Sequence, residues 1–140
     1  MKKALVLGAL AVVALTQAGC ATQVKSLPLA AAGGESRGDV QVFFGQQNHP
    51  AVKSQLGDVA YSVRIARKVA SADDACHEAL AEAVRKLRDA ARERHANAVI
   101  DVSTRFHSTE TSSSTDFTCG VSPSAAAIAV RGQLVVLEAN

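Results

Sequence analysis

Residues 71–104 have the sequence SADDACHEALAEAVRKLRDAARERHANAVIDVST, which predicts a long amphipathic helix, a short turn at 95–97 and a buried strand. The helix is expected to begin near Asp73, because Ser71 and Asp74 resemble a capping box. Apolar side chains follow at spacings of three and four and form one stripe: Cys76, Leu80, Ala83, Val84, Leu87, Ala90 and Ala91. Asn97 lies where the backbone reverses, and we expect it to take the left-handed conformation.

Around this helix–strand unit, the sequence predicts a small α+β domain with one helix packed on a mixed or antiparallel sheet of about four strands. Alternating β-branched and aromatic residues place these strands at residues 40–44, 59–65, 99–106 and 125–137. Period two places four residues of the third strand on one side: Ile100, Val102, Thr104 and Phe106. Gly132 interrupts the last strand and predicts a bulge or a close backbone approach.

The segment 107–116 contains seven Ser and Thr residues, so we expect a mobile polar loop there. Residues 20–39 are rich in Gly and small side chains and are expected to form a flexible tether. The single α+β domain is then expected to span residues 40–140.

The N-terminal residues 1–19 have the pattern of a signal peptide, because Lys2 and Lys3 precede an apolar run at 4–15. This run is too short to span a bilayer as a helix. Small residues before Cys20 resemble the bacterial lipobox, in which the cysteine becomes the lipidated N-terminus, although Gln17 stands where an aliphatic residue is usual. We predict lipidation at Cys20, with ordinary signal cleavage nearby as the alternative.

The charge balance argues against a nucleic-acid partner. The formal net charge of +2 belongs to Lys2 and Lys3, and the chain without them carries 13 basic residues against 13 acidic ones. A nucleic-acid interface would need a clear excess of basic residues. The sequence also has no phosphate-binding loop and no nucleophile motif. We therefore predict no nucleotide, no cofactor and no catalytic residue, and we expect the protein not to be an enzyme.

Three cysteines are present, an odd number for a chain that enters an oxidising compartment. Lipidation of Cys20 would leave Cys76 and Cys119 to form one disulfide. Two free thiols or a metal site are the alternatives. Metal-ligand spacings such as C-x-x-C or H-x-x-x-H are absent from the sequence, so His77 and His107 are only weak candidates for metal ligands.

Three motifs follow one another in a distinctive order. Asp73-Asp74-Ala75-Cys76 opens the helix, Ala96-Asn97-Ala98-Val99 follows its end, and Cys119 precedes the run AAIAVRG at 126–132. This order resembles small exported proteins of the YbjQ/RcsF-like family over about residues 40–137. The start VQVFFG at 40–45 resembles short envelope proteins often labelled "excinuclease ATPase subunit", a label that does not fit a chain without a nucleotide-binding loop. Such relatives have Gly where His95 stands, so we expect a different helix cap here.

The resemblance implies an outer-membrane lipoprotein that faces the periplasm, with a soluble periplasmic protein as the alternative. The function expected from the sequence is that of a non-enzymatic envelope lipoprotein, held at the membrane by its lipid anchor. Its disulfide-stabilised domain would bind another envelope protein or a second copy of itself, or take part in the response to envelope stress. A periplasmic domain that binds a metal or a small ligand is the alternative function.

Overall fold

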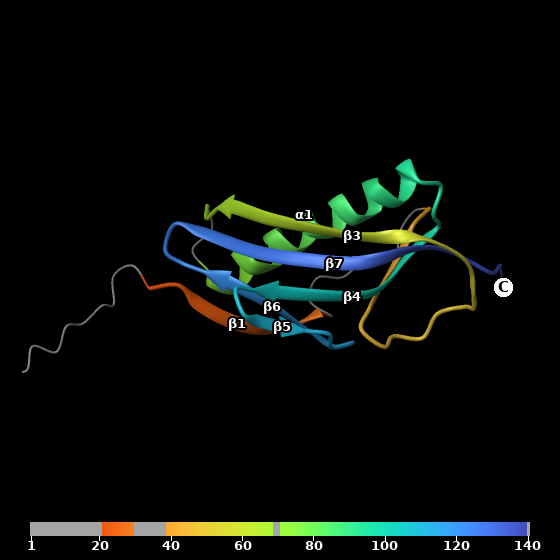
Figure 1. Ribbon diagram of the computed structural model, residues 1–140. Helices are drawn as coiled ribbons and strands as arrows, with labels where there is room; N and C mark the ends of the chain where they lie inside the picture. Colours follow the sequence, from red (N-terminus) through yellow and green to blue (C-terminus); the bar gives the residue numbers. More distant parts are fainter. Residues whose placement is uncertain (1–20, 30–38, 69–70, 140) are drawn as a thin grey trace, which may run out of the picture.

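The structure is a computed structural model that describes residues 21–29, 39–68 and 71–139. In these residues the chain forms one helix, α1 (Ala72–Glu93), and one seven-stranded sheet (Figure 1). The strands are β1 (Gln23–Pro28), β2 (Gln41–Phe44), β3 (Val52–Ala66), β4 (Ala98–Phe106), β5 (Thr109–Thr111), β6 (Asp116–Val121) and β7 (Ala125–Leu137). The predicted α+β class is confirmed, whereas the expected number of about four strands is wrong.

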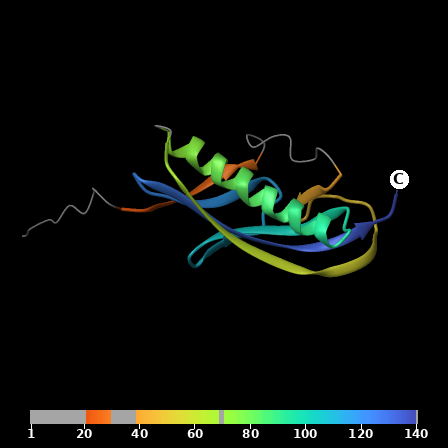
Figure 2. The same ribbon diagram turned by 90° about the horizontal axis from the view of Figure 1, so that it is seen from above.

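Strand β7 lies at the centre of the sheet. It pairs with β3 along one edge and with β6 and β4 in succession along the other (Figure 1). The remaining strands extend the sheet, because β1 pairs with β6, whereas β2 and β5 both pair with β4. Only the β2–β4 pair among the described strands is parallel, so the sheet is mixed. Helix α1 crosses one face of this sheet (Figure 2).

Strand β1 occupies part of the segment 20–39 that was expected to be a tether. It pairs with β6 in an antiparallel register from Gln23 to Pro28, and Leu27 and Leu29 are buried in the core. The Pro and Gly content of the segment predicted a tether. The strand was not expected because its partner, β6, lies almost 100 residues later in the chain. Residues 30–38 lie outside the described part of the chain.

Strand β5 lies in the segment 107–116 that was expected to be a mobile loop. It forms a hairpin with β4 through a turn at His107 and Ser108. Threonine hydroxyls link three strands here, because Thr111 Oγ1 lies 2.5 Å from Thr118 Oγ1, and the Thr118 backbone N–H donates to Thr104 Oγ1 at 2.8 Å. One threonine of the expected loop is therefore hydrogen-bonded to a buried threonine of the sheet, whereas residues 112–115 lie outside any strand.

A bulge in β4 reverses part of the predicted side-chain pattern. The β4–β7 register shifts between Ile100 and Ser103, and Asp101 has a φ of 54°. Asp101 and Val102 together oppose Gly132, so the alternation of sides changes at this point. Val102 faces α1, whereas Ile100 packs in a second, smaller apolar cluster. The expectation that these two side chains share one side is wrong.

Gly132 is a site of close approach between strands, as predicted. A Cβ atom at this position would lie 2.7 Å from Val99 Cγ1 and 3.0 Å from Val102 Cγ2. The irregularity itself is in β4, where the extra residue brings both valine side chains over the glycine. Glycine is therefore required here by packing rather than by its own backbone conformation.

The two ends of α1 differ in how well the sequence predicted them. Ser71 caps the first turn, because its side chain accepts a hydrogen bond from the Asp74 backbone N–H at 3.2 Å, as predicted. At the other end, His95 takes the left-handed conformation, with a φ of 62°, and the prediction for Asn97 is wrong. Asn97 instead bonds Leu137 in β7 with its side chain, donating to the carbonyl at 3.2 Å and accepting from the N–H at 2.7 Å.

Replacing His95 with glycine is expected to stabilise the domain by about 1 kcal/mol, because glycine adopts the left-handed conformation without the steric cost that a Cβ atom adds. The exposed position of the His95 side chain means that little packing is lost. Urea denaturation of the wild type and the variant measures the difference. His95→Ala is the matched control and should not stabilise. A His95→Gly variant that is less stable than the wild type would contradict this account.

Candidate functional site

The sheet face beneath α1 is filled by the hydrophobic core. The helix residues that pack into it are Ala75, Cys76, Ala79, Leu80, Ala83, Val84, Leu87, Ala90 and Ala91. Their small side chains bring the helix close to the sheet. This face is therefore closed to a partner, whereas the opposite face of the sheet is not covered by α1.

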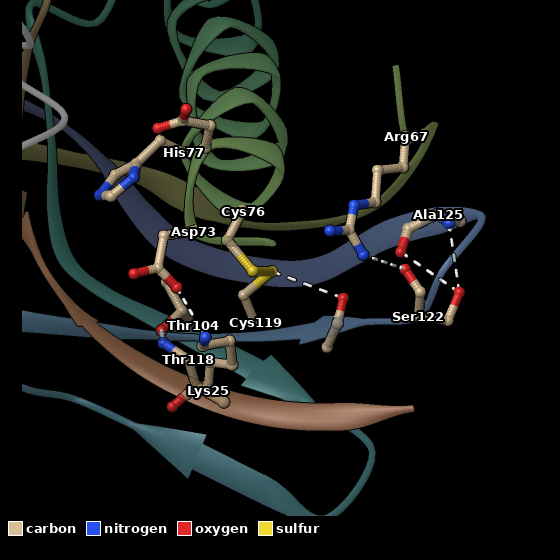
Figure 3. Close-up of a disulfide and its surroundings, with 12 residues drawn as sticks. Lys25, Arg67, Asp73, Cys76, His77, Thr104, Thr118, Cys119, Ser122 and Ala125 are labelled. Carbon is tan, nitrogen blue, oxygen red and sulfur yellow. Dashed lines mark hydrogen bonds and ion pairs between the residues drawn. A yellow bond between two sulfur atoms is a disulfide. The ribbon is translucent and has the colours of Figure 1, made fainter. Parts of the chain in front are cut away.

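The predicted disulfide between Cys76 and Cys119 is confirmed. It joins the first turns of α1 to β6 across a Cα–Cα distance of 5.9 Å, and both cysteines are fully buried (Figure 3). An ion pair of 2.7 Å between Asp73 and Lys25 joins the same end of the helix to β1. The disulfide is therefore structural, because neither sulfur atom is accessible to solvent or to a reactant.

The two histidines considered as metal ligands lie on different elements. The His77 ring on α1 packs edge-on against Phe117, and its Nε2 lies 3.5 Å from the Pro28 carbonyl oxygen. The His107 ring, at the β4–β5 turn, packs against Phe106. The described residues contain no group of three His, Cys, Asp or Glu side chains that could hold a metal ion. The structure therefore does not bring either histidine together with further ligands.

A groove runs along the sheet face opposite α1. It consists of two adjoining hollows of about 190 and 290 Å³, which share Ser62, Arg105 and Ala129. Small side chains of β3 and β7 form its floor: Ala60, Ser62, Ala127 and Ala129. Three arginines from three different strands line it: Arg64, Arg105 and Arg131. We call this feature the open-face groove.

One carboxylate balances part of this positive charge. Glu110 accepts a hydrogen bond from the Ser103 hydroxyl at 2.9 Å and forms an ion pair of 2.7 Å with Arg131. The Ser103 hydrogen bond, together with the charges of Arg131 and Arg105, lowers the pKa of Glu110 below its ordinary value. Glu110 is therefore ionised at neutral pH, and the groove keeps a positive excess from its arginines.

The open-face groove was not predicted from the sequence. Arg64 and Arg67 are near neighbours in the sequence, but only Arg64 lines the groove, whereas Arg67 donates to the Ser122 carbonyl at 3.1 Å (Figure 3). Arg105 and Arg131 lie more than 25 positions apart in the sequence. They come close because β4 and β7 are neighbours, with Arg105 opposite Ala129. The sequence indicates only that Arg105 and Arg131 occupy exposed positions of alternating strands. The order of the strands in the sheet is what makes them neighbours.

The predicted lipidation site Cys20 and the predicted signal peptide lie outside the described residues. Within the described part of the chain, no helix combines the length and the apolar character that a membrane span requires. Comparison of the chain with models of protein families, with curated proteins and with solved structures finds no match.

Proposed function

We propose that this chain is a non-enzymatic envelope lipoprotein whose disulfide-stabilised domain binds an extended acidic segment of another envelope protein. The observation that supports binding is the open-face groove, where three guanidinium groups line a floor of small side chains with one carboxylate among them. The signal-like N-terminus and Cys20 support export and anchoring. The Cys76–Cys119 disulfide is consistent with an oxidising compartment.

The chemistry of the groove favours an acidic segment in an extended conformation. Side chains of alanine and serine leave room above β3 and β7 for the backbone of a bound segment. Arginine binds carboxylates with two parallel hydrogen bonds, which gives orientation as well as affinity. Glu110 already pairs with Arg131, so Arg105, which also donates to the His107 carbonyl at 3.0 Å, is the main group that would bind a carboxylate of the partner.

Binding of a labelled decapeptide of alternating Glu and Ser tests this proposal, with a Lys–Ser decapeptide as the comparison. We expect fluorescence anisotropy to show binding of the acidic peptide only, weakened by salt because charges are screened. Arg105→Glu should weaken the affinity by about tenfold or more. Arg85→Glu, the same charge change on the exposed face of α1, is the matched control. Equal loss of binding in both variants, or binding of the basic peptide alone, would contradict the groove as the site.

A photo-crosslinking residue at Ser62 tests the proposal in intact cells. We expect an adduct to a different protein that disappears when Arg105→Glu is added, and no such adduct from a crosslinker at Glu78 on α1. An adduct to a different protein that persists with Arg105→Glu would count against recognition by charge, whereas an adduct between two copies of this chain, recognised by its mass, does not bear on the groove. Stoichiometric zinc or copper in the purified chain, lost on His77→Ala or His107→Ala, would support the metal-binding alternative instead.

A further inference from the structure

Strand β3 has one edge without a partner strand in the described structure. It pairs with β7 along its whole length and lies outermost in the sheet, on the side remote from β1 (Figure 1). An edge of this kind presents unpaired N–H and C=O groups and is a template for pairing with another chain.

The first half of this edge is irregular. The register with β7 shifts between Val52 and Ser54 and again between Gln55 and Gly57. Arg94, just beyond α1, donates to the Leu56 carbonyl at 2.7 Å. From Asp58 to Ala66 the register continues without interruption. The second half of β3 is thus a regular strand with nothing in the described structure hydrogen-bonded to its outer edge.

The outward groups can be assigned from the hydrogen-bond pattern. The Arg67 N–H donates to the Ser124 carbonyl at 2.9 Å, which continues the register of the Ala66–Ala125 pair. Because N–H and C=O groups point to alternate edges along a strand, the odd-numbered residues from 59 to 65 bond β7. The even-numbered residues direct their N–H and C=O groups outward: Asp58, Ala60, Ser62 and Arg64.

We propose that this edge pairs with the same edge of a second copy of the chain, antiparallel and about a twofold axis at Tyr61. In this register Asp58 lies opposite Arg64 of the partner subunit, and the symmetry repeats the pair on the other side of the axis. Ala60 lies opposite Ser62 of the partner subunit. Opposite charges on facing strands stabilise a pair, so the sequence of this edge is complementary to itself.

Charge selects this register over its neighbours. An axis at Asp58 would place Asp58 opposite its own copy, and an axis at Arg64 would do the same for Arg64. In both cases like charges repel. An axis at Val59, Ala60 or Ser62 would place both charges opposite uncharged residues. An axis at Val63 would place Arg64 opposite Ser62 and Asp58 opposite Lys68, which lies beyond the end of β3. Registers with the axis between two residues would set outward groups against inward ones and break the ladder. Only the axis at Tyr61 joins Asp58 to Arg64.

The apolar side chains on the α1 side of this edge also favour pairing. Val59, Tyr61 and Ile65 pack against the core but remain partly exposed. In the proposed register Val59 lies opposite Val63 of the partner subunit, and Tyr61 lies opposite its own copy. Pairing would therefore cover apolar surface on one face and join the two open-face grooves on the other, because Ser62 and Arg64 line the groove.

Sedimentation equilibrium of the exported chain carrying Cys20→Ser, which retains every described residue, measures the dimer. We expect Asp58→Arg and Arg64→Asp each to weaken dimerisation by about tenfold or more, because each places like charges opposite one another. The double variant Asp58→Arg/Arg64→Asp should restore the dimer, since it exchanges the two charges. A chain that remains monomeric at about 100 μM, or a double variant as weak as the single ones, would overturn the proposal.

Cysteine crosslinking tests the register itself. Tyr61→Cys is expected to form a disulfide-linked dimer on oxidation, whereas Val59→Cys alone should not. An equal mixture of Val59→Cys and Val63→Cys chains should crosslink to each other. Self-crosslinking of Val59→Cys as efficient as that of Tyr61→Cys would exclude the register. Arg105→Glu should leave the dimer unchanged, so failure of acidic-peptide binding and failure of dimerisation are separate results.

Discussion

Replacing Cys76 and Cys119 together by alanine is expected to lower the free energy of unfolding by about 4 kcal/mol. The disulfide joins residues 43 positions apart, and closing a loop of this length removes that much conformational entropy from the unfolded chain in the chain-entropy model. Both cysteines are fully buried between α1 and β6, so the variant also loses packing at the centre of the core. Guanidinium denaturation under non-reducing conditions measures the loss.

Reduction provides the control for this variant. A reductant should shift the denaturation midpoint of the wild type toward that of the double variant and leave the double variant unchanged. If the reductant fully reduces the protein and the midpoint of the wild type does not move, the disulfide does not contribute the expected stability. Intact mass, which falls by the mass of two hydrogen atoms on oxidation, shows which form is present.

Replacing Gly132 by valine is expected to destabilise the domain by about 3 kcal/mol, at the upper end for overpacking of a core. The new Cβ atom would collide with the side chains of Val99 and Val102, both fully buried in β4. These side chains have little room to move, because α1 packs on the same face. Thermal or denaturant unfolding of the purified variant measures the effect.

Gln133→Val is the matched control, because it adds the same side chain at the next position of β7 on the opposite face. Gln133 is only partly buried and pairs with Ile100 and Asp58, so valine should be tolerated there. Equal destabilisation by both substitutions would show that the cost is not specific to the close approach of β4. A Gly132→Val variant as stable as the wild type would contradict the packing described for the bulge.

Features that depend on residues near in sequence were predicted well. The capping of α1 by Ser71 and the apolar stripe of the helix follow from spacings within a few turns. The Cys76–Cys119 pairing followed from a count of cysteines in a chain expected to be exported, and not from geometry. The three short strands β1, β5 and β6 were missed because their pairing with other strands decides their conformation and their own side chains do not.

The side-chain pattern of β4 failed for a different reason. A single extra residue at Asp101 exchanges the two sides of the strand, and no composition signal marks a bulge of this kind. The open-face groove was missed because its arginines belong to three strands whose order in the sheet cannot be read from alternation alone. The strands that carry these arginines were predictable, but not which strands are neighbours.

The central position of β7 has a consequence for the order of folding. This strand follows every other described element in the sequence, yet it pairs with β3, β4 and β6. A chain that becomes available from its N-terminus, as in synthesis, can therefore form α1 early, whereas the sheet has no centre until residues 125–137 are also available. Long-range pairing of this kind slows folding. Completion of the sheet thus depends on the last strand of the chain.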